Sequence, residues 1–280
     1  MPVLDLHERA GFLVLDQEEC RAKGAELKER YVNAAPFQHI VLDDFIDPSV
    51  LRKVIAEFPD SQNMPHFDRT QERLKYQYGP KYWCGATTNN LFALFNSEAF
   101  VSFLEEMTGI DGLIPDPAFT GGGLHETKRG GHLGVHADFN LHKKLGLIRR
   151  LNLLLYLNDH WSPEYGGNLE LWDTSMKTRE VEVVPDLGRA VVFNTSLDSY
   201  HGHPGPLTCP PDRSRRSMAL YYYTSPRDGL ANVPIRTTQF QARPDSTDKT
   251  DWQVKRRHLL DDWLPPGARR LAQRLRPVRK

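Results

Sequence analysis

Cysteine is scarce in this sequence, and long apolar runs are absent from it. Its 280 residues include only three cysteines, Cys20, Cys84 and Cys209, which lie far apart and form no Cys-x-x-Cys pair. A disulfide framework or a zinc knuckle is therefore not expected. No apolar stretch approaches the length of a membrane span, and the first residues lack the basic and apolar regions of a secretory signal. We therefore expect a cytoplasmic protein that does not bind membranes.

A net charge of one sign is also lacking. Lys and Arg number 36 and Asp and Glu number 36, so the net charge is +0 with His neutral. Such a balance gives no general electrostatic attraction to nucleic acid, and we expect no nucleic-acid partner. Hydrophobic residues make up 39% and aromatic residues 10% of the chain, which is enough for a real core. The length suits one large domain or two small ones, and the oligomeric state is not indicated.

Helical patterns dominate the first part of the chain. Residues 17–32 read as a largely solvated helix, and a second helix is predicted after Asp47, with Pro48 at its first position. A third helix is predicted to begin at Ser97 and to stop at Gly109. We interpret this region as a helical support that also carries the first strand or strands of a sheet.

Short apolar runs alternate with turn residues after about residue 110, which is typical of an antiparallel barrel or sandwich. We therefore divide the chain into the N-terminal support at 1–110, a β-core at 111–230 and a basic, helical C-terminal extension at 231–280. The extension could be an interaction tail, but a solvated helix packed across the same domain is the simpler interpretation.

A His-x-Asp pair stands in the segment GVHADFN. His136 and Asp138 are two residues apart, so in an extended strand they face the same side, where they can share a proton or a metal ion. His201 and His203 follow a later predicted strand that ends at Phe193, and a barrel can bring such distant strands together. Two histidines and one carboxylate leave three coordination positions open, which suits Fe(II), although zinc hydrolases can use similar ligands.

A basic residue opens the apolar strand that contains RRSMALYYY. A buried arginine at this place, Arg215 or Arg216, needs an anion, and a guanidinium binds a carboxylate through two parallel hydrogen bonds. A dicarboxylate cosubstrate could then bind the metal at one end and the arginine at the other.

The motifs HAD, RRLNLLLYLN, YGGNLELWD, GRAVVF, YHGHP and RRSMALYYY, taken in this order, resemble the Fe(II)/2-oxoglutarate-dependent dioxygenases. The resemblance is closest to the prolyl-4-hydroxylase-like branch, and it is strongest over residues 120–224. It implies a mainly β protein with flanking helices (α+β), built on a double-stranded β-helix, or jelly-roll and cupin-like, core. It also implies an enzyme that converts 2-oxoglutarate and O₂ to succinate and CO₂ and hydroxylates an unactivated C–H bond. Ascorbate is left open as an additional requirement.

The resemblance assigns the catalytic metal ligands to single residues. His136 and Asp138 match the His-x-Asp ligands, and His201 matches the distal histidine because it follows the strand ending at Phe193 by the usual short loop. His203 is the competing choice, and otherwise it is expected to line the cosubstrate pocket.

The cosubstrate residues follow from the resemblance and from the strand period of two. Arg215 shares a face with Ser217 in the family's Arg-x-Ser pattern, whereas Arg216 shares the bulkier face, so Arg215 is expected to bind the distal carboxylate. Tyr156 matches a tyrosine that donates its hydroxyl to this carboxylate in part of the family, with a core aromatic as the alternative. Asn152 lies on the same strand face as Tyr156.

The substrate is less well defined. The resemblance suggests proline, free or peptidyl, while small polar metabolites are also substrates of related enzymes. Residues 60–90 and 139–149 read as irregular segments at the predicted mouth and are rich in polar and basic side chains, which favours a polar or anionic substrate. Arg149 and Arg150 are interpreted as part of a charged loop. The competing functions are a non-catalytic cupin-like module that binds a metal or ligand, and a zinc hydrolase on the same barrel.

Overall fold

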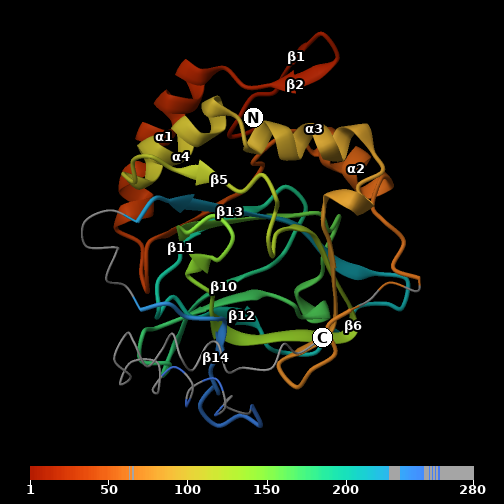
Figure 1. Ribbon diagram of the computed structural model, residues 1–280. Coiled ribbons are helices and arrows are strands. Elements are labelled where there is room, and N and C mark those ends of the chain that lie inside the picture. The colour runs from red at the N-terminus through yellow and green to blue at the C-terminus, as the bar shows by residue number, and fades with distance from the viewer. Residues whose placement is uncertain are drawn as a thin grey trace.

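An antiparallel sheet closes into a nearly complete barrel, and helices cover one side of it (Figure 1). This computed structural model describes residues 1–62, 64, 66–226, 234–248, 252, 254, 256 and 258. The helices are α1 (Gln17–Val32), α2 (Pro48–Ala56), α3 (Ala86–Phe95) and α4 (Glu98–Thr108). Short 3-10 turns occupy Pro80–Tyr82 and Pro163–Tyr165. The α+β jelly-roll architecture expected from the sequence is confirmed.

The main sheet has 12 strands, and eight of them follow one another in the order β10-β9-β12-β6-β13-β8-β11-β3. Within this path, β3 and β11 form one end, and β9 and β10 form the other. The strands on the path are β3 (His39–Leu42), β6 (Gly123–Ala137), β8 (Leu147–Tyr156), β9 (Leu169–Trp172), β10 (Arg179–Val183), β11 (Ala190–Asn194), β12 (His201–His203) and β13 (Ser214–Thr224). The others are β4 (Glu72–Tyr78), β5 (Ile114–Pro115), β7 (Leu141–His142) and β14 (Gln239–Phe240), with a separate hairpin of β1 (His7–Arg9) and β2 (Phe12–Val14).

The helix ends follow local capping chemistry. The Asp47 side chain accepts a hydrogen bond from the backbone N–H of Ser49 at the start of α2, and Ser97 accepts one from Phe100 at the start of α4. Gly109 ends α4 at φ +70°, a left-handed conformation that glycine adopts without strain. The predicted starts of α2 and α4 and the predicted end of α4 are confirmed. Helix α1 spans 17–32 as predicted but is less solvated than expected, because one face packs against α4.

Two elements occupy the stretch of residues 60–90 that was predicted to be irregular. Strand β4 pairs with β6, and α3 begins at Ala86. The N-cap residue of α3 is Gly85, which has no side chain to accept a hydrogen bond. Instead, the distant Glu57 carboxylate accepts from the N–H groups of Thr87 and Thr88, at 3.0 and 2.7 Å. A sequence search for local caps therefore misses this helix.

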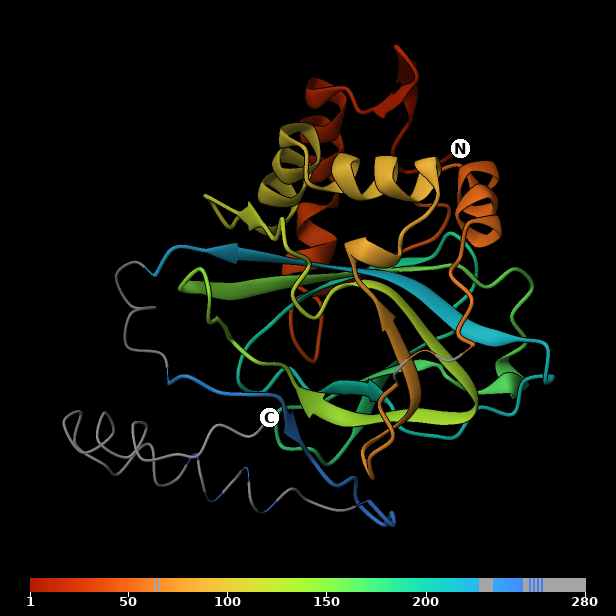
Figure 2. The same cartoon turned by 45° about the vertical axis from the view of Figure 1, so that its right-hand side comes forward.

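Strands β8 and β13 present one face to the helices and the other to the barrel interior (Figure 2). The helix-facing residues are Leu151, Leu153, Leu155, Met218, Leu220 and Tyr222, all buried in the main core. A smaller cluster that includes Tyr156, Leu169 and Phe193 forms the barrel interior. The face of β13 predicted to be bulkier, with Met218, Leu220 and Tyr222, therefore packs in the main core under the helices.

Strand β6 crosses from one wall of the barrel to the other. Its first half pairs with β13 and its last residues pair with β12. Gly123 opens it at φ +109°, where a Cβ atom would lie 2.4 Å from the carbonyl oxygen of Tyr78. This glycine permits the close approach of β4.

The first 110 residues contribute β3 and β4 to the main sheet, through pairing with β11 and β6. Within 231–280, β14 pairs with the end of β6. The predicted basic helix there falls mostly outside the described residues, so the domain division stays a prediction. Among the described residues, no helix combines the length and apolar character that crossing a bilayer requires.

The three cysteines have unequal surroundings, and we expect unequal reactivity. Cys20 and Cys209 are buried and Cys84 is exposed. Burial raises the pKa of the Cys20 thiol to about 11, so almost none of it is thiolate at pH 8. Iodoacetamide should therefore modify Cys84 in the native protein at least about 100-fold faster than Cys20. Mass spectrometry of digests taken at timed intervals measures both rates. Equal rates are expected only in the urea-unfolded protein, so equal rates in the native protein would contradict the described packing.

Candidate functional site

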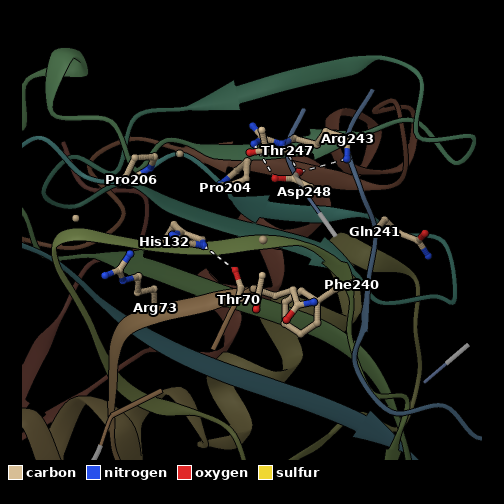
Figure 3. A pocket seen from close by; sticks show the side chains of 14 residues that line it. Thr70, Arg73, His132, Pro204, Pro206, Phe240, Gln241, Arg243, Thr247 and Asp248 are labelled. Carbon is tan, nitrogen blue, oxygen red and sulfur yellow. Dashed lines mark hydrogen bonds and ion pairs between the residues drawn. The ribbon is translucent and has the colours of Figure 1, made fainter. Parts of the chain in front are cut away.

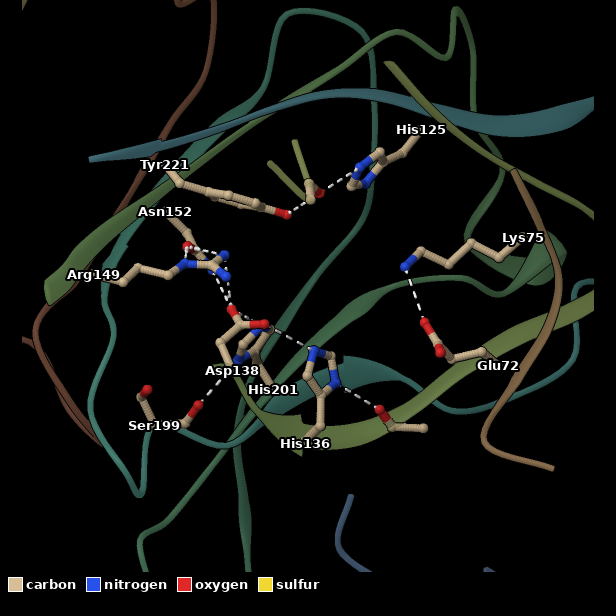
Figure 4. A network of polar contacts seen from close by, with 12 residues as sticks. Glu72, Lys75, His125, His136, Asp138, Arg149, Asn152, Ser199, His201 and Tyr221 are labelled. Atoms are coloured by element: carbon tan, nitrogen blue, oxygen red, sulfur yellow. Dashed lines mark hydrogen bonds and ion pairs between the residues drawn. The ribbon is translucent and has the colours of Figure 1, made fainter. Parts of the chain in front are cut away.

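The end of β6 and the start of β12 bring three potential metal ligands together (Figure 4). His136 and His201 face each other in the antiparallel register of the two strands, and Asp138 follows directly after β6. One ligand atom from each residue lies within 4.8 Å of the others. The Nε2 atoms of both histidines lie 3.5 Å from carboxylate oxygens of Asp138. His203 is not part of this cluster.

Backbone carbonyl groups fix the orientation of both imidazole rings. The Nδ1 atom of His136 lies 2.8 Å from the Gly134 oxygen, and that of His201 lies 3.0 Å from the Ser199 oxygen. Because a carbonyl oxygen only accepts, each Nδ1 must carry the proton, which leaves Nε2 with a free lone pair directed at the cluster. Burial, followed by the neighbouring His136, lowers the pKa of His201 to about 4. The ring is therefore neutral at pH 7, the state that binds a metal.

The carboxylate of Asp138 is held by two side chains from β8. Arg149 Nη2 lies 3.0 Å from its Oδ2 atom, and Asn152 Nδ2 donates to the same oxygen at 2.8 Å. Burial by itself would raise the pKa of this carboxyl, but the positive charge of Arg149 is the largest of the influences that outweigh it. The pKa of Asp138 therefore lies well below its usual range. The cluster thus offers ring nitrogens from two histidines and one carboxylate whose ionised form is favoured, a donor set that fits Fe(II).

Arg149 is the main site residue that the sequence reading missed. It was interpreted as part of a charged loop, and this was wrong, because it lies in β8 and is only 1% exposed. The register between β8 and β13 shifts at this point, since Tyr222 pairs with Leu151 whereas Tyr223 pairs with Arg149. The shift turns Arg149 into the barrel on the same side as Asn152, where its guanidinium stacks on Tyr221 at 3.4 Å.

A cavity of about 80 Å³ inside the barrel connects the cluster to the predicted cosubstrate residues. Ser217 lies opposite Tyr156 in the register of β13 and β8, and Arg215 lies two residues before Ser217. The residues lining the cavity are Lys75, His125, Thr127, Leu133, His136, Asp138, Asn152, Leu154, Leu169, His201, Gly202, His203, Arg215, Ser217 and Tyr221. Tyr156 borders this group through a contact of 3.3 Å with Arg215 Nη2.

Arg215 and Arg216 differ in their partners. Arg215 is 6% exposed, its Nε donates to the Gly167 carbonyl oxygen, and no carboxylate pairs with it in the part of the chain that the structure describes. Arg216 lies on the other face of β13 and pairs with Glu126 at 3.2 Å. The buried charge that needs an external anion is therefore that of Arg215.

Further polar residues enter this cavity. His203 is 4% exposed and its Nδ1 has no hydrogen-bond partner among the described residues. Lys75 enters from β4 and pairs with Glu72 at 3.2 Å. Lys75 could not be predicted, because its position depends on the long-range pairing of β4 with β6.

A separate cavity of about 360 Å³ lies on the far side of β6 (Figure 3). It contains His132, whose Nε2 contacts the Thr70 carbonyl oxygen, and the ion pair of Arg243 with Asp248. None of the three clustered ligands lines it. Phe240 of β14 lines this cavity and packs against the His136 ring with 5.3 Å between ring centroids, so this side supports the cluster from behind.

The geometry separates the two candidate distal histidines experimentally. We expect His201→Ala to weaken Fe(II) binding by more than about 100-fold, because it removes a ligand and not merely a residue that orients one. We expect His203→Ala to weaken it by less than about 10-fold. Anaerobic Fe(II) titration followed by competition with a coloured chelator measures both, and the reverse ranking would exchange the roles of the two residues.

Comparison with known proteins identifies one family match and several structures of similar fold. Residues 122–223 match the family model of the 2OG-Fe(II) oxygenase superfamily. No curated protein sequence matches the chain significantly. Among solved structures, a Pseudomonas putida prolyl-4-hydroxylase is 17% identical, with a TM-score of 0.52, and the match covers 72% of this chain and 98% of that one.

Two further structures share the fold. A prolyl hydroxylase from Trichoplax adhaerens, in complex with a peptide fragment of the hypoxia inducible factor, is 16% identical with a TM-score of 0.51 and coverage of 74% and 92%. The non-heme alpha ketoglutarate dependent epimerase SnoN of nogalamycin biosynthesis is 13% identical with a TM-score of 0.50 and coverage of 81% and 92%. Residues 122–223 therefore resemble the 2OG-Fe(II) oxygenase superfamily, and the fold is like that of the prolyl-4-hydroxylases.

Proposed function

We propose that this enzyme hydroxylates an unactivated C–H bond of a polar substrate, with His136, Asp138 and His201 as the ligands of Fe(II). The observation that carries the proposal is one cavity that holds two features: three converging ligands, and a buried arginine without a carboxylate partner among the described residues. Bound Fe(II) would supply the redox chemistry that couples O₂ to the decarboxylation of 2-oxoglutarate. The protein residues bind and orient the reactants.

The distal carboxylate of 2-oxoglutarate is proposed to bind Arg215, with Ser217 and Tyr156 as hydrogen-bond donors. The antiparallel register supports this grouping, because Ser217 lies opposite Tyr156 and Arg215 contacts the Tyr156 hydroxyl. A charged guanidinium in a buried site binds a carboxylate strongly and with a defined orientation. His203 lines the same cavity and is proposed to contact the cosubstrate through its unpartnered nitrogen.

Asn152 has a different proposed task from the one expected from the sequence. It was grouped with the cosubstrate residues, but its amide donates to Asp138 and accepts from Arg149 Nε. Asn152 and Arg149 are therefore proposed as positioning residues. They hold one carboxylate oxygen of Asp138, so that the group keeps its charge and a single orientation toward the metal.

The substrate class is proposed as a polar small molecule or a peptidyl residue. Prolyl substrates are supported only by likeness of fold to the two prolyl hydroxylases, which at this identity concerns architecture and not specificity. The assay described below tests whether ascorbate is required. A non-catalytic module or a zinc hydrolase has no need of Arg215 as an anion anchor, and the family match favours the oxygenase over both.

The test is release of succinate from 2-oxoglutarate in air by the purified protein with Fe(II), with and without ascorbate. We expect slow turnover without substrate, faster turnover in the presence of the true substrate, and loss of both on adding a chelator. N-oxalylglycine should inhibit competitively with 2-oxoglutarate, because both present a carboxylate to the same arginine. A protein that binds Fe(II) and yet forms no succinate with any member of a broad panel of amino acids, peptides and sugars would refute the proposal.

A further inference from the structure

A larger cavity is lined by Arg149, the residue that contacts Asp138 of the metal cluster. Its volume is about 480 Å³. It is built from the residues before β3, the start of β8 and the loop after β11. Its lining residues are Phe37, Gln38, Asn140, Ile148, Arg149, Arg150, Asn194, Thr195, Ser196 and Leu197. None of these residues is acidic, and two are arginines. The cosubstrate cavity is much smaller, with a volume of about 80 Å³.

Arg149 connects this cavity to the metal cluster. Its Nε donates to Asn152 Oδ1 at 2.9 Å, and its Nη2 lies 3.0 Å from Asp138 Oδ2. Its third nitrogen, Nη1, is fully buried and has no hydrogen-bond partner among the described residues. Buried polar groups in folded proteins are almost always paired, so a ligand oxygen is the natural partner of this donor.

A second buried polar atom without a partner belongs to the same wall. Thr195 lines the cavity, and its hydroxyl oxygen is likewise buried and unpaired among the described residues. Its backbone N–H donates to the Arg150 carbonyl oxygen at 2.9 Å, which fixes the loop to the start of β8. Two residues that line the cavity, one from β8 and one from the loop after β11, thus each carry a buried polar atom without a partner among the described residues, as a binding surface for an oxygen-rich group would.

The charges beside this cavity leave one positive charge uncompensated. Asp138 balances Arg149, but Arg150 has no carboxylate partner in the described part of the chain, and its recorded side-chain contact is the Thr224 hydroxyl at 3.4 Å. Burial lowers the pKa of Arg150, consistent with a cation held away from bulk water. One remaining positive charge matches a monoanion, whereas a phosphate ester would bring two negative charges.

Building on the proposed oxygenase function, we propose that this arginine-lined cavity binds the primary substrate, and that the substrate is an organic monocarboxylic acid. Its carboxylate binds Arg150 and Arg149 Nη1, and the Thr195 hydroxyl supplies a further hydrogen bond. Phe37, Ile148 and Leu197 provide apolar contacts for the rest of the molecule. The carboxylate then lies beside the guanidinium of Arg149, whose Nη2 contacts Asp138 Oδ2.

The test uses pairs of probes that differ only in charge. N-acetyl-L-proline and N-acetyl-L-leucine are compared with their primary amides, in anaerobic protein saturated with Fe(II) and 2-oxoglutarate. The readout is the shift of the weak visible band of the Fe(II)–2-oxoglutarate complex. We expect the acids to half-saturate this shift at concentrations at least about 10-fold lower than the amides.

Variants assign the effect to the cavity. Arg150→Gln and Thr195→Val should each raise the half-saturating concentration of the acids, by about 10-fold for Arg150→Gln, and leave that of 2-oxoglutarate unchanged. Arg52→Gln is the matched control, because Arg52 is an exposed arginine that pairs with Asp159 far along the chain. Provided that the band itself is present, three results would each overturn the assignment. The acids could bind no better than the amides, neither could shift the band, or both variants could keep the full preference for acids. Absence of the band in the wild type would instead refute the underlying oxygenase function.

Discussion

Replacing Asp138 with asparagine is expected to weaken Fe(II) binding by more than about 100-fold and to abolish substrate-stimulated succinate release. The amide is similar in size to the carboxylate but carries no charge, so the cluster loses its anionic ligand. Anaerobic titration with Fe(II) measures the first effect, and succinate release measures the second.

The same substitution should also lower stability. Arg149 is 1% exposed and pairs with Asp138, so the change leaves a buried cation without its anion. Breaking one partner of a buried pair typically costs about 3–5 kcal/mol of the free energy of unfolding. Asp173→Asn is the control, since Asp173 is a turn residue that accepts hydrogen bonds from backbone N–H groups and is not one of the clustered ligands. An Asp138→Asn protein with wild-type iron affinity would remove Asp138 from the ligand set.

Arg215→Ala is expected to raise the apparent KM for 2-oxoglutarate by at least about 100-fold. Arg215 is buried in the cosubstrate cavity without a carboxylate partner among the described residues, so the cosubstrate would complete its pairing. Loss of a buried, charge-assisted contact of about 3 kcal/mol corresponds to a change of more than 100-fold in binding. Initial rates of succinate formation at varied 2-oxoglutarate give the value.

Arg216→Ala is the matched control, from the next position in the same strand. Arg216 pairs with Glu126, which is 1% exposed, so its loss should lower the thermal midpoint and leave the KM for 2-oxoglutarate within about 3-fold of the wild type. A larger KM effect for Arg216→Ala than for Arg215→Ala would mean that the opposite face of β13 binds the cosubstrate.

Local rules predicted the parts of the fold that local residues determine. Asp47 and Ser97 cap their helices through their own side chains, and Gly109 ends α4 in a left-handed conformation, so these boundaries are visible in the sequence. Helix α3 is different, because Glu57 caps its first N–H groups. Glu57 lies 30 residues before Thr87, which is one of the donors. A cap provided by tertiary structure leaves no local pattern to read.

The site residues divide in the same way, into those that local patterns predict and those that depend on pairing between distant strands. The strand period of two placed His136 beside Asp138 and Arg215 beside Ser217, and the structure gathers all four in one cavity. Arg149 and Lys75 could not be found in this way. A register shift between β8 and β13 turns Arg149 into the barrel, and the pairing of β4 with β6 brings in Lys75. Both depend on contacts between distant strands, which a single sequence does not specify.

The most direct test of the account is an anaerobic titration of the protein with 2-oxoglutarate in the presence of Fe(II), followed by visible absorption. The account predicts a weak band that saturates at one equivalent of iron, that is absent with Zn(II), and that requires far more 2-oxoglutarate in Arg215→Ala than in Arg216→Ala. An iron-loaded protein that gives no such band at any 2-oxoglutarate concentration would contradict the assignment of this cavity as an Fe(II)/2-oxoglutarate site.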